Sequence, residues 1–296
     1  MRDTRRPVEP RFTYSMRPVA YAAVGEFSGQ VVVVTGAGSG IGRSSALLFA
    51  RLGAKVHVAD IDGASAERVV AEIEQADGAA VAHTFDARDV AAVEALAESV
   101  FEADGRVDVL HNNAGIGHAA NIELTTFEDW ERVIGVNLLG IAYVAQAFIP
   151  RMLRAGGRAS IVNTASMAGL VAAPQMAPYS ASKFGVVGLS ESLNAELRPR
   201  GIHVCAVCPG IIDTPITRSA IMRGEPEGRR QQAIEFYRKR GAPPDDVAEA
   251  VVDAVRKRKL IQPVPRSHVT PLWMLKRLAP RAAQVIARTL PKIVER

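Results

Sequence analysis

The feature that most constrains the fold of this chain is a run of four valines, residues 31–34, followed at once by a glycine-rich turn and a helical pattern. An uninterrupted apolar run of this kind is typical of a strand buried on both faces of a sheet. Apolar runs and helical patterns then alternate, and the further predicted strands are 55–59, 80–85, 107–110, 159–163, 203–207 and 261–265. Such alternation predicts parallel strands joined by right-handed crossovers. We therefore expect a doubly wound α/β fold, whose ligands lie at the carboxyl ends of the strands.

The glycine-rich turn at residues 35–42 reads Thr-Gly-Ala-Gly-Ser-Gly-Ile-Gly. Glycine lets the backbone turn sharply and approach a pyrophosphate closely. The helix that follows offers free N–H groups and a partial positive charge to the anion. Glycines alone also form ordinary tight turns, but the order strand, glycines, helix favours dinucleotide binding. The expected phosphate-side contacts are Gly36, Ser39, Gly40, Ile41 and Gly42.

An acidic residue, Asp60, ends the second predicted strand 18 residues beyond Gly42. A dinucleotide fold places a carboxylate on the adenosine ribose at about this spacing. Such a carboxylate accepts hydrogen bonds from the ribose hydroxyls and repels a 2′-phosphate, so we expect NAD in preference to NADP. Arg43 is the one nearby base that argues for NADP. The alternative for Asp60 is an acid that only caps the turn at residues 62–63.

A serine, a tyrosine and a lysine form the predicted catalytic group. Ser166 ends the fifth strand 13 residues before Tyr179, and Lys183 follows Tyr179 by four residues. Residues four apart lie on the same face of a helix. A phenol has a pKa of about 10, and we expect a neighbouring ammonium and an oxidised nicotinamide to lower it. Tyr179 is then the expected acid/base, and the serine hydroxyl holds the same substrate oxygen.

Over residues 27–254 the chain resembles the short-chain dehydrogenases/reductases. The matching positions are 35–42, Asp60, Asp86, 112–115, Asn137, Ser166, Tyr179, Lys183, Pro209 and Gly210. The resemblance implies a single Rossmann-fold domain over 29–265 and a homodimer or homotetramer. It also implies an enzyme that interconverts a secondary alcohol and a ketone with NAD(H). A non-catalytic dinucleotide-binding sensor or scaffold is the alternative, although such a protein is expected to lack the tyrosine, lysine or serine that this chain keeps.

The resemblance also assigns roles to residues. Tyr179 is the acid/base and Ser166 orients the substrate, while Lys183 holds the nicotinamide ribose and, with Asn137, a proton-relaying water. Asp86 meets the adenine and Asn113 the adenosine side, and Ile212 and Thr214 meet the carboxamide. Without the resemblance, Asn137 could equally be a polar residue that kinks its helix. The cofactor contacts implied beyond the glycine-rich turn are Asp60, Asp86, Asn113, Gly115, Tyr179, Lys183, Pro209, Ile212 and Thr214.

The residues after the serine, 167–176, are apolar and end at Met176. An apolar wall suits an uncharged, hydrophobic alcohol or ketone. We therefore expect Ser166, Tyr179 and Met176 to contact the substrate, unless the run packs only against the lid that the resemblance implies at 210–241. No histidine or acidic cluster has the spacing of metal ligands, so no metal is expected.

Charge is unevenly distributed between the body of the chain and its C-terminal end. The net charge is +5, yet residues 256–296 alone hold eleven Lys/Arg and one acid, so nucleic-acid binding by the body is not expected. The tail, 266–296, predicts a helix over 270–293 that restarts at Pro280. Its basic, amphipathic character resembles a helix lying on an anionic membrane surface. The alternative is a helix docked on its own domain or on a neighbouring subunit.

The N-terminal residues 1–28, with five arginines and three prolines, predict a poorly ordered arm without the apolar stretch of a signal sequence. Cys205 and Cys208 lie three apart in a predicted strand, so their side chains should point to opposite faces. Two cysteines without a disulfide pattern fit a reducing compartment. We expect a cytoplasmic protein, with peripheral membrane contact through the tail left open.

Overall fold

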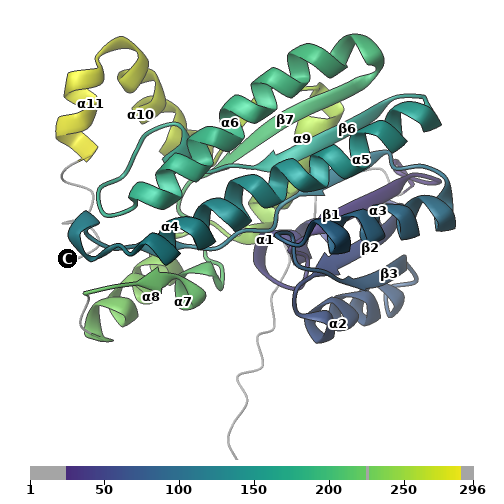
Figure 1. The fold of residues 1–296 in the computed structure, drawn as a ribbon, viewed down its shortest axis with the longest axis horizontal. Coiled ribbons are helices and arrows are strands. Elements are labelled where there is room, and N and C mark those ends of the chain that lie inside the picture. Colours follow the sequence, from purple (N-terminus) through teal and green to yellow (C-terminus); the bar gives the residue numbers. More distant parts are fainter. Residues whose placement is uncertain (1–24, 225–226, 288–296) are drawn as a thin grey trace, which may run out of the picture.

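A parallel sheet forms the centre of the computed structural model, which describes residues 25–224 and 227–287 (Figure 1). The strand order is β3-β2-β1-β4-β6-β7-β9, and every neighbouring pair is parallel. The order reverses direction between β1 and β4, which is the switch point of a doubly wound sheet. The strands are β1 (Val31–Thr35), β2 (Lys55–Asp60), β3 (Ala79–Thr84), β4 (Val109–Asn112), β6 (Ala159–Thr164), β7 (Ile202–Pro209) and β9 (Ile261–Val264). The predicted fold class is therefore confirmed.

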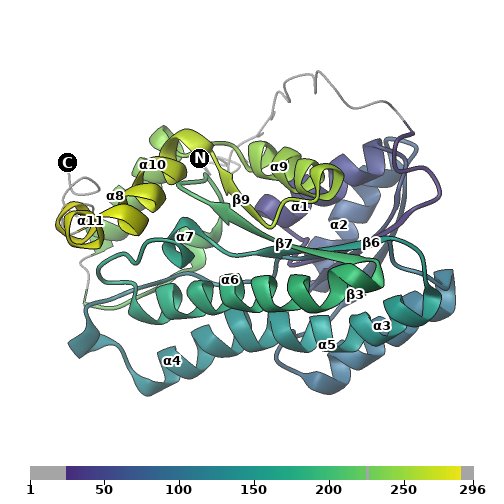
Figure 2. The same ribbon diagram turned by 90° about the horizontal axis from the view of Figure 1, so that it is seen from above.

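Helices cover both faces of the sheet, as Figure 2 shows. On one face lie α1 (Gly40–Arg51), α2 (Gly63–Glu74) and α9 (Pro244–Lys257). On the other lie α3 (Val90–Asp104), α5 (Ile141–Ala155) and α6 (Ala177–Leu197). The central strand β1 therefore buries both faces: Val32 and Val34 belong to one core, Val31 and Val33 to the other.

The two cysteines follow this alternation along β7. Cys205 packs in the core under α1 and α9, whereas Cys208 packs on the opposite face, near α6. Both thiols are free and fully buried, and burial raises the pKa of Cys205 to about 12. The expected separation of the pair is confirmed, and neither thiol has the ionised form that metal binding or redox exchange requires.

The helix predicted over 127–152 has an irregular centre. It consists of α4 (Phe127–Ile134), a π-helical segment (Gly135–Gly140) and α5. A π-helical turn inserts an extra residue and often marks a functional position; here it carries Asn137. The combined run is long and apolar enough to cross a membrane by composition alone, but it packs beside α3 and α6 as one of the core layers.

Two smaller units flank the carboxyl edge of the sheet. The first holds α7 (Ile216–Ser219), β8 (Ile221–Met222) and α8 (Glu227–Arg240), and β8 pairs with β5 (His118–Ala119). The second is the tail, where α10 (Arg266–Leu278) and α11 (Pro280–Ala287) pack against each other. The tail helix thus begins before 270 and restarts at Pro280 as predicted, while 288–296 and arm residues 1–24 lie outside the described residues. The predicted domain boundaries at 29 and 265 remain predictions.

Candidate active site

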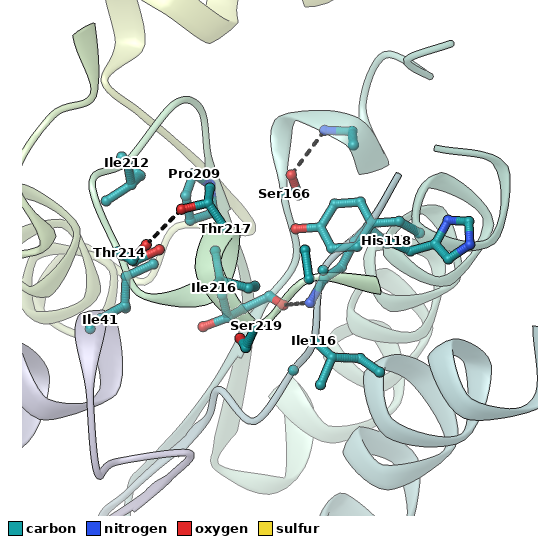
Figure 3. A pocket seen from close by; sticks show the side chains of 18 of the residues that line it. Ile41, Ile116, His118, Ser166, Pro209, Ile212, Thr214, Ile216, Thr217 and Ser219 are labelled. Atoms are coloured by element: carbon teal, nitrogen blue, oxygen red, sulfur yellow. Dashed lines mark hydrogen bonds between the residues drawn. The ribbon is translucent and has the colours of Figure 1, made fainter. Parts of the chain in front are cut away.

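A cavity of about 650 Å³ lies at the carboxyl ends of the strands. Its walls come from the turn after β1, the ends of β2, β4, β6 and β7, the start of α6, and the unit from α7 to α8. Figure 3 shows Ser166 on one side of this cavity and Ile41, Ile212 and Thr214 on the other. The structure thus brings the predicted phosphate-side and catalytic residues to one space, except Gly42 and Asn137.

The glycine-rich turn has the backbone that an approaching phosphate requires. Gly36 and Gly40 have φ values of +62° and +52°, where a side chain is strained. A Cβ on Gly36 would lie 2.8 Å from Ala114 Cα, and one on Gly42 would lie 2.1 Å from Gly36 O. Ser39 leaves the start of α1 without a side-chain cap, and the first turn of α1 holds no acid. These residues fit the pyrophosphate of a dinucleotide.

Of the five residues expected on the phosphate side, Gly42 is the one that does not line the cavity. It packs beneath the turn, against Gly36 O and the Asn113 amide, because only a residue without a Cβ fits there. Its part is therefore to let the turn close, and the cavity is lined by Gly36, Ser39, Gly40 and Ile41 instead.

Asp60 lies at the edge of the same turn. Its carboxylate accepts hydrogen bonds from Gly38 N at 2.8 Å and from Asp62 N at 3.0 Å. The side chain that caps α2 is that of Asp62, which accepts from Ser65 N. Asp60 thus does cap the turn at residue 62, as the alternative expects, but its carboxylate also lines the cavity.

Two arginines near the adenosine end are paired with acids. Arg43 forms an ion pair with Glu72 on α2 and does not line the cavity. Arg88 donates to both oxygens of Asp86, and this hydrogen bonding lowers the pKa of Asp86. Sequence reasoning missed Arg88, although its place two residues after Asp86 could have indicated it.

Asn113 connects the ends of three strands. Its amide donates to Thr35 O at 3.1 Å and Gly36 O at 3.2 Å, and its Oδ1 accepts from Thr164 Oγ1 at 3.0 Å. The side chain lines the cavity while its polar atoms are committed to the protein. Asn113 therefore holds the shape of the site, and the role implied at the adenosine side remains a prediction.

The predicted catalytic residues Ser166, Tyr179 and Lys183 lie at the end of β6 and the start of α6. The Ser166 hydroxyl accepts from Ala168 N at 3.1 Å, and the side chain of Ser166 acts to lower the pKa of Tyr179. Lys183 Nζ lies 5.8 Å from the centre of the Tyr179 ring and donates to Thr164 O at 2.9 Å. Sequence reasoning missed this Thr164 contact, although the residue ends a strand that points at the site.

Asn137 lies behind this group and does not line the cavity. Its Oδ1 accepts from Ile116 N at 2.8 Å, and its Nδ2 donates to Ile116 O at 2.9 Å. A Cβ on Gly115 would lie 3.2 Å from Asn137 Oδ1 and 3.5 Å from Lys183 Nζ. Gly115 therefore leaves a narrow space between the asparagine and the lysine. Asn137 lies in the helix irregularity, as the alternative expects, and its role in holding a water remains a prediction.

The electrostatics of Tyr179 differ from the expectation. Burial raises the pKa of Tyr179 to about 12. The side chain of Ser166 acts in the opposite direction and lowers this pKa. The phenol of Tyr237, on α8, raises it further. Burial also lowers the pKa of Lys183 to about 8. The expectation that the ammonium lowers the phenol pKa is wrong for the protein's own groups, because desolvation dominates and the ammonium is directed at Thr164 O.

The remaining predicted residues border the substrate and nicotinamide side. Pro209, Ile212 and Thr214 follow β7 and line the cavity, and a Cβ on Gly40 would lie 3.3 Å from Thr214 Cβ. Met176 also lines it, whereas Leu170 of the same apolar run is buried in the core. Part of the apolar run 167–176 therefore lines the cavity, and another part packs in the core. Within 25–224 and 227–287, no cluster of three or more His, Cys, Asp or Glu could hold a metal.

Known proteins are similar to this chain in sequence and in fold. The model of the short chain dehydrogenase family matches residues 30–223. The chain is 39% identical to "Probable oxidoreductase EphD" of Mycobacterium tuberculosis over 271 residues, which cover 89% of this chain but only 45% of that protein. It thus spans about half the length of that relative. It is also 39% identical to a D-threitol dehydrogenase of Mycolicibacterium smegmatis over 226 residues, covering 76% of this chain and 85% of that one.

Solved structures are similar as well. A short chain dehydrogenase/reductase from Burkholderia phymatum in complex with NAD has a TM-score of 0.78 and 33% identity, with 85% of this chain and 94% of that chain covered. A 3-ketoacyl-(acyl-carrier-protein) reductase from Brucella melitensis complexed with NADH has a TM-score of 0.71 and 35% identity, with 80% and 97% covered.

Proposed function

This chain belongs to the short chain dehydrogenase family of NAD(P)-dependent oxidoreductases acting on CH–OH groups, and we propose that it interconverts a hydrophobic secondary alcohol and a ketone. The observation that carries the proposal is the pair Ser166 and Tyr179, which lines the same cavity as the glycine-rich turn. A sensor or scaffold would need neither this pair nor the adjacent Lys183, so catalysis is the better explanation of the site.

The chemistry follows from the acid and the hydrogen-bond donor. When bound, the nicotinamide supplies or accepts the hydride at the substrate carbon. In ketone reduction, Tyr179 donates its phenolic proton to the carbonyl oxygen, and Ser166 donates a hydrogen bond to the same oxygen as negative charge develops. In alcohol oxidation the proton returns to the Tyr179 oxygen. Lys183 would hold the nicotinamide ribose, and Asn137 and Lys183 would together hold a water through which the proton is exchanged.

The raised pKa of Tyr179 favours one direction of the reaction. A phenol with a pKa of about 12 stays protonated at neutral pH, which is the form that reduces a ketone. Alcohol oxidation needs the phenolate, which a positive charge beside the ring stabilises. Ketone reduction is therefore the direction that we propose the site supports at neutral pH.

For the cofactor we propose NAD in preference to NADP. The Asp60 carboxylate lies where the adenosine ribose is expected and would repel a 2′-phosphate. Arg43, the base that could have reversed this preference, is paired with Glu72 outside the cavity. Asp86 would meet the adenine, although its carboxylate is also bonded to Arg88.

The substrate class follows from the walls of the cavity, which are mostly apolar beyond the catalytic residues. Met176, Val171 and Phe236 are among its lining residues, so we propose an uncharged, hydrophobic substrate. The relatives include both a D-threitol dehydrogenase and a cyclohexanol dehydrogenase, and the apolar walls favour a substrate of the second kind.

The oligomeric state and the location are further proposals. Phe127 of α4 is 87% exposed and Leu139 is 41% exposed, which supports a homodimer or homotetramer that covers these side chains. We place the enzyme in the cytoplasm, in peripheral contact with membranes through α11. Leu278, at the end of α10, and Val285 of α11 are 80% and 60% exposed, and residues 254–294 contain no acid to neutralise the tail's basic residues.

A direct test combines cofactor binding with turnover. The protein should bind NADH, detected by nicotinamide fluorescence, and oxidise it in the presence of hydrophobic ketones. Tyr179→Phe should retain NADH affinity and lose turnover by about 10²-fold to 10⁴-fold, the contribution typical of a general acid. Retained turnover in this variant would contradict the role of Tyr179, and NADH binding without turnover of any ketone in the wild type would favour the sensor.

A further inference from the structure

Helix α10 is attached to the body by a single face. Val269, Leu272, Trp273 and Lys276 recur at helical spacing, and Val269 is fully buried. Leu272 and Trp273 pack against the core that also holds Leu170 and Val171. The opposite face, with Met274 and Leu278, is exposed. Helix α10 is therefore docked on the chain's own domain. Leu278 lies on its opposite, undocked face.

Lys276 joins α10 to both segments that carry catalytic residues. Its ammonium donates to Leu170 O at 2.7 Å, and Nζ lies 4.0 Å from the centre of the Phe184 ring. Leu170 follows Ser166 by four residues, and Phe184 directly follows Lys183. A cation over an aromatic ring and a charge-assisted hydrogen bond are both favourable when partly removed from water. One side chain therefore fixes α10 against the serine loop and the lysine helix at once.

Leu272 lies one helical turn before Lys276 and lines the catalytic cavity. Val269, one turn earlier, packs beside Gly210, where a Cβ would lie 3.2 Å from Val269 Cγ2. The same face of α10 that is anchored at both ends thus presents Leu272 to the substrate space. Val171, which also lines the cavity, belongs to the same apolar cluster.

We propose that α10 is a wall of the substrate pocket, in which Leu272 sets the size of the hydrophobic group accepted and Lys276 is the positioning residue that holds this wall beside Ser166. The proposal rests on the proposed ketone-reducing function. The ligand class is the alkyl or cycloalkyl part of the ketone, because Leu272 offers only an aliphatic surface. A loosely held α10 would leave the hydrophobic end of the substrate without a fixed contact, so the reacting carbonyl would be less well positioned.

Substitutions of Leu272 test the wall. Leu272→Ala should raise the ratio of kcat/KM for a large to a small cyclic ketone by about tenfold, and Leu272→Trp should lower it by a similar factor. Leu278→Ala is the matched control on the same helix, because Leu278 is 80% exposed. Its ratio should equal that of the wild type. NADH affinity should stay unchanged in all three variants. Unchanged ratios in both Leu272 variants, with an active wild type, would overturn the inference and leave the proposed function intact.

Substitutions of Lys276 test the anchor. Lys276→Met should lower kcat/KM for the large ketone and reduce discrimination between the two ketones, and Lys276→Arg should restore part of both. A structural role alone would lower the melting temperature without changing the ratio, and that result would overturn the positioning role.

Ligand binding provides a readout that does not need turnover. Trp130 and Trp273 are the chain's two tryptophans, and Trp273 directly follows Leu272. In a Trp130→Phe background, Trp273 fluorescence should report the binding of the two ketones, and Leu272→Ala should shift the ratio of their Kd values in the same direction as the kinetic ratio. If wild type binds NADH but reduces no ketone, the proposed function fails, and the Kd ratios alone then support the wall if they shift and overturn it if they do not.

Discussion

Arg223 and Asp129 pair across the boundary between the unit at 216–240 and the body of the protein. Arg223 Nη2 donates to Asp129 Oδ1 at 2.8 Å, and the Asp129 side chain is only 3% exposed. Asp129 also closes the capping box at the start of α4, and His118 of β5 lies 3.8 Å from its carboxylate. The hydrogen bonds from Arg223 lower the pKa of Asp129 to about 2. The pair, with the β5–β8 bridge, therefore holds this unit over the cavity.

Breaking this pair should loosen the unit. Arg223→Ala leaves Asp129 without its cation, and we expect a rise in ketone KM of roughly threefold to tenfold with a smaller change in kcat. Steady-state kinetics measure both. Lys239→Ala is the control, because Lys239 forms only an exposed helical pair with Glu235. An unchanged KM in Arg223→Ala would show that the β5–β8 bridge alone holds the unit.

The direction of catalysis should depend on pH through Tyr179. Because the pKa of the phenol is raised to about 12, its neutral form predominates at pH 7 and its phenolate grows as the pH rises. Alcohol oxidation, which needs the phenolate, should therefore rise by about tenfold per pH unit over the range in which the phenol is mostly protonated. Ketone reduction should not rise in this way. Initial rates in both directions between pH 6 and 10, at saturating cofactor, provide the measurement, and equal pH profiles would contradict the assignment.

The cofactor preference should depend on Asp60. Asp60→Ala removes the carboxylate that is expected to accept from the ribose, so NADH affinity should fall by about tenfold or more while NADPH affinity improves. Fluorescence titration with both cofactors gives the two Kd values. Asp62→Ala is the control at the same turn: it removes the cap of α2 but should leave the ratio of Kd values unchanged. A wild type that already prefers NADPH would refute the ribose argument.

Local sequence order was sufficient to predict the parts of the site that are set by neighbouring residues. The turn from Gly36 to Gly42 has its shape because the glycines follow a buried strand and precede a helix. Tyr179 and Lys183 share a helix face because they are four residues apart. The sheet itself could be predicted because both faces of each central strand are apolar.

Features set by distant contacts could not be predicted. Asn137, in the π-helical segment, bonds Ile116 across 21 residues. The raised pKa of Tyr179 depends on the burial of the whole site. The docked face of α10 depends on Leu170, 106 residues before Lys276. In each case the feature depends on residues far apart in the sequence, and local sequence patterns do not show which of them come into contact.

The exposed part of the tail should bind anionic membranes. Leu278 and Val285 are exposed, and Arg277 and Arg281 are exposed beside them on a tail whose described residues hold no acid. Each basic residue near an anionic bilayer contributes about 1 kcal/mol to the free energy of binding. Salt screens this electrostatic attraction. The full-length protein should therefore sediment with phosphatidylserine-containing vesicles at low salt and less at high salt. Arg281→Glu combined with Leu278→Ser should reduce sedimentation by about tenfold or more, whereas Lys239→Glu on α8 should not. Because α10 docks through its other face, these changes should leave ketone turnover in solution unchanged. Equal sedimentation of the wild type and both variants would rule out membrane contact through the exposed face of α10 and α11.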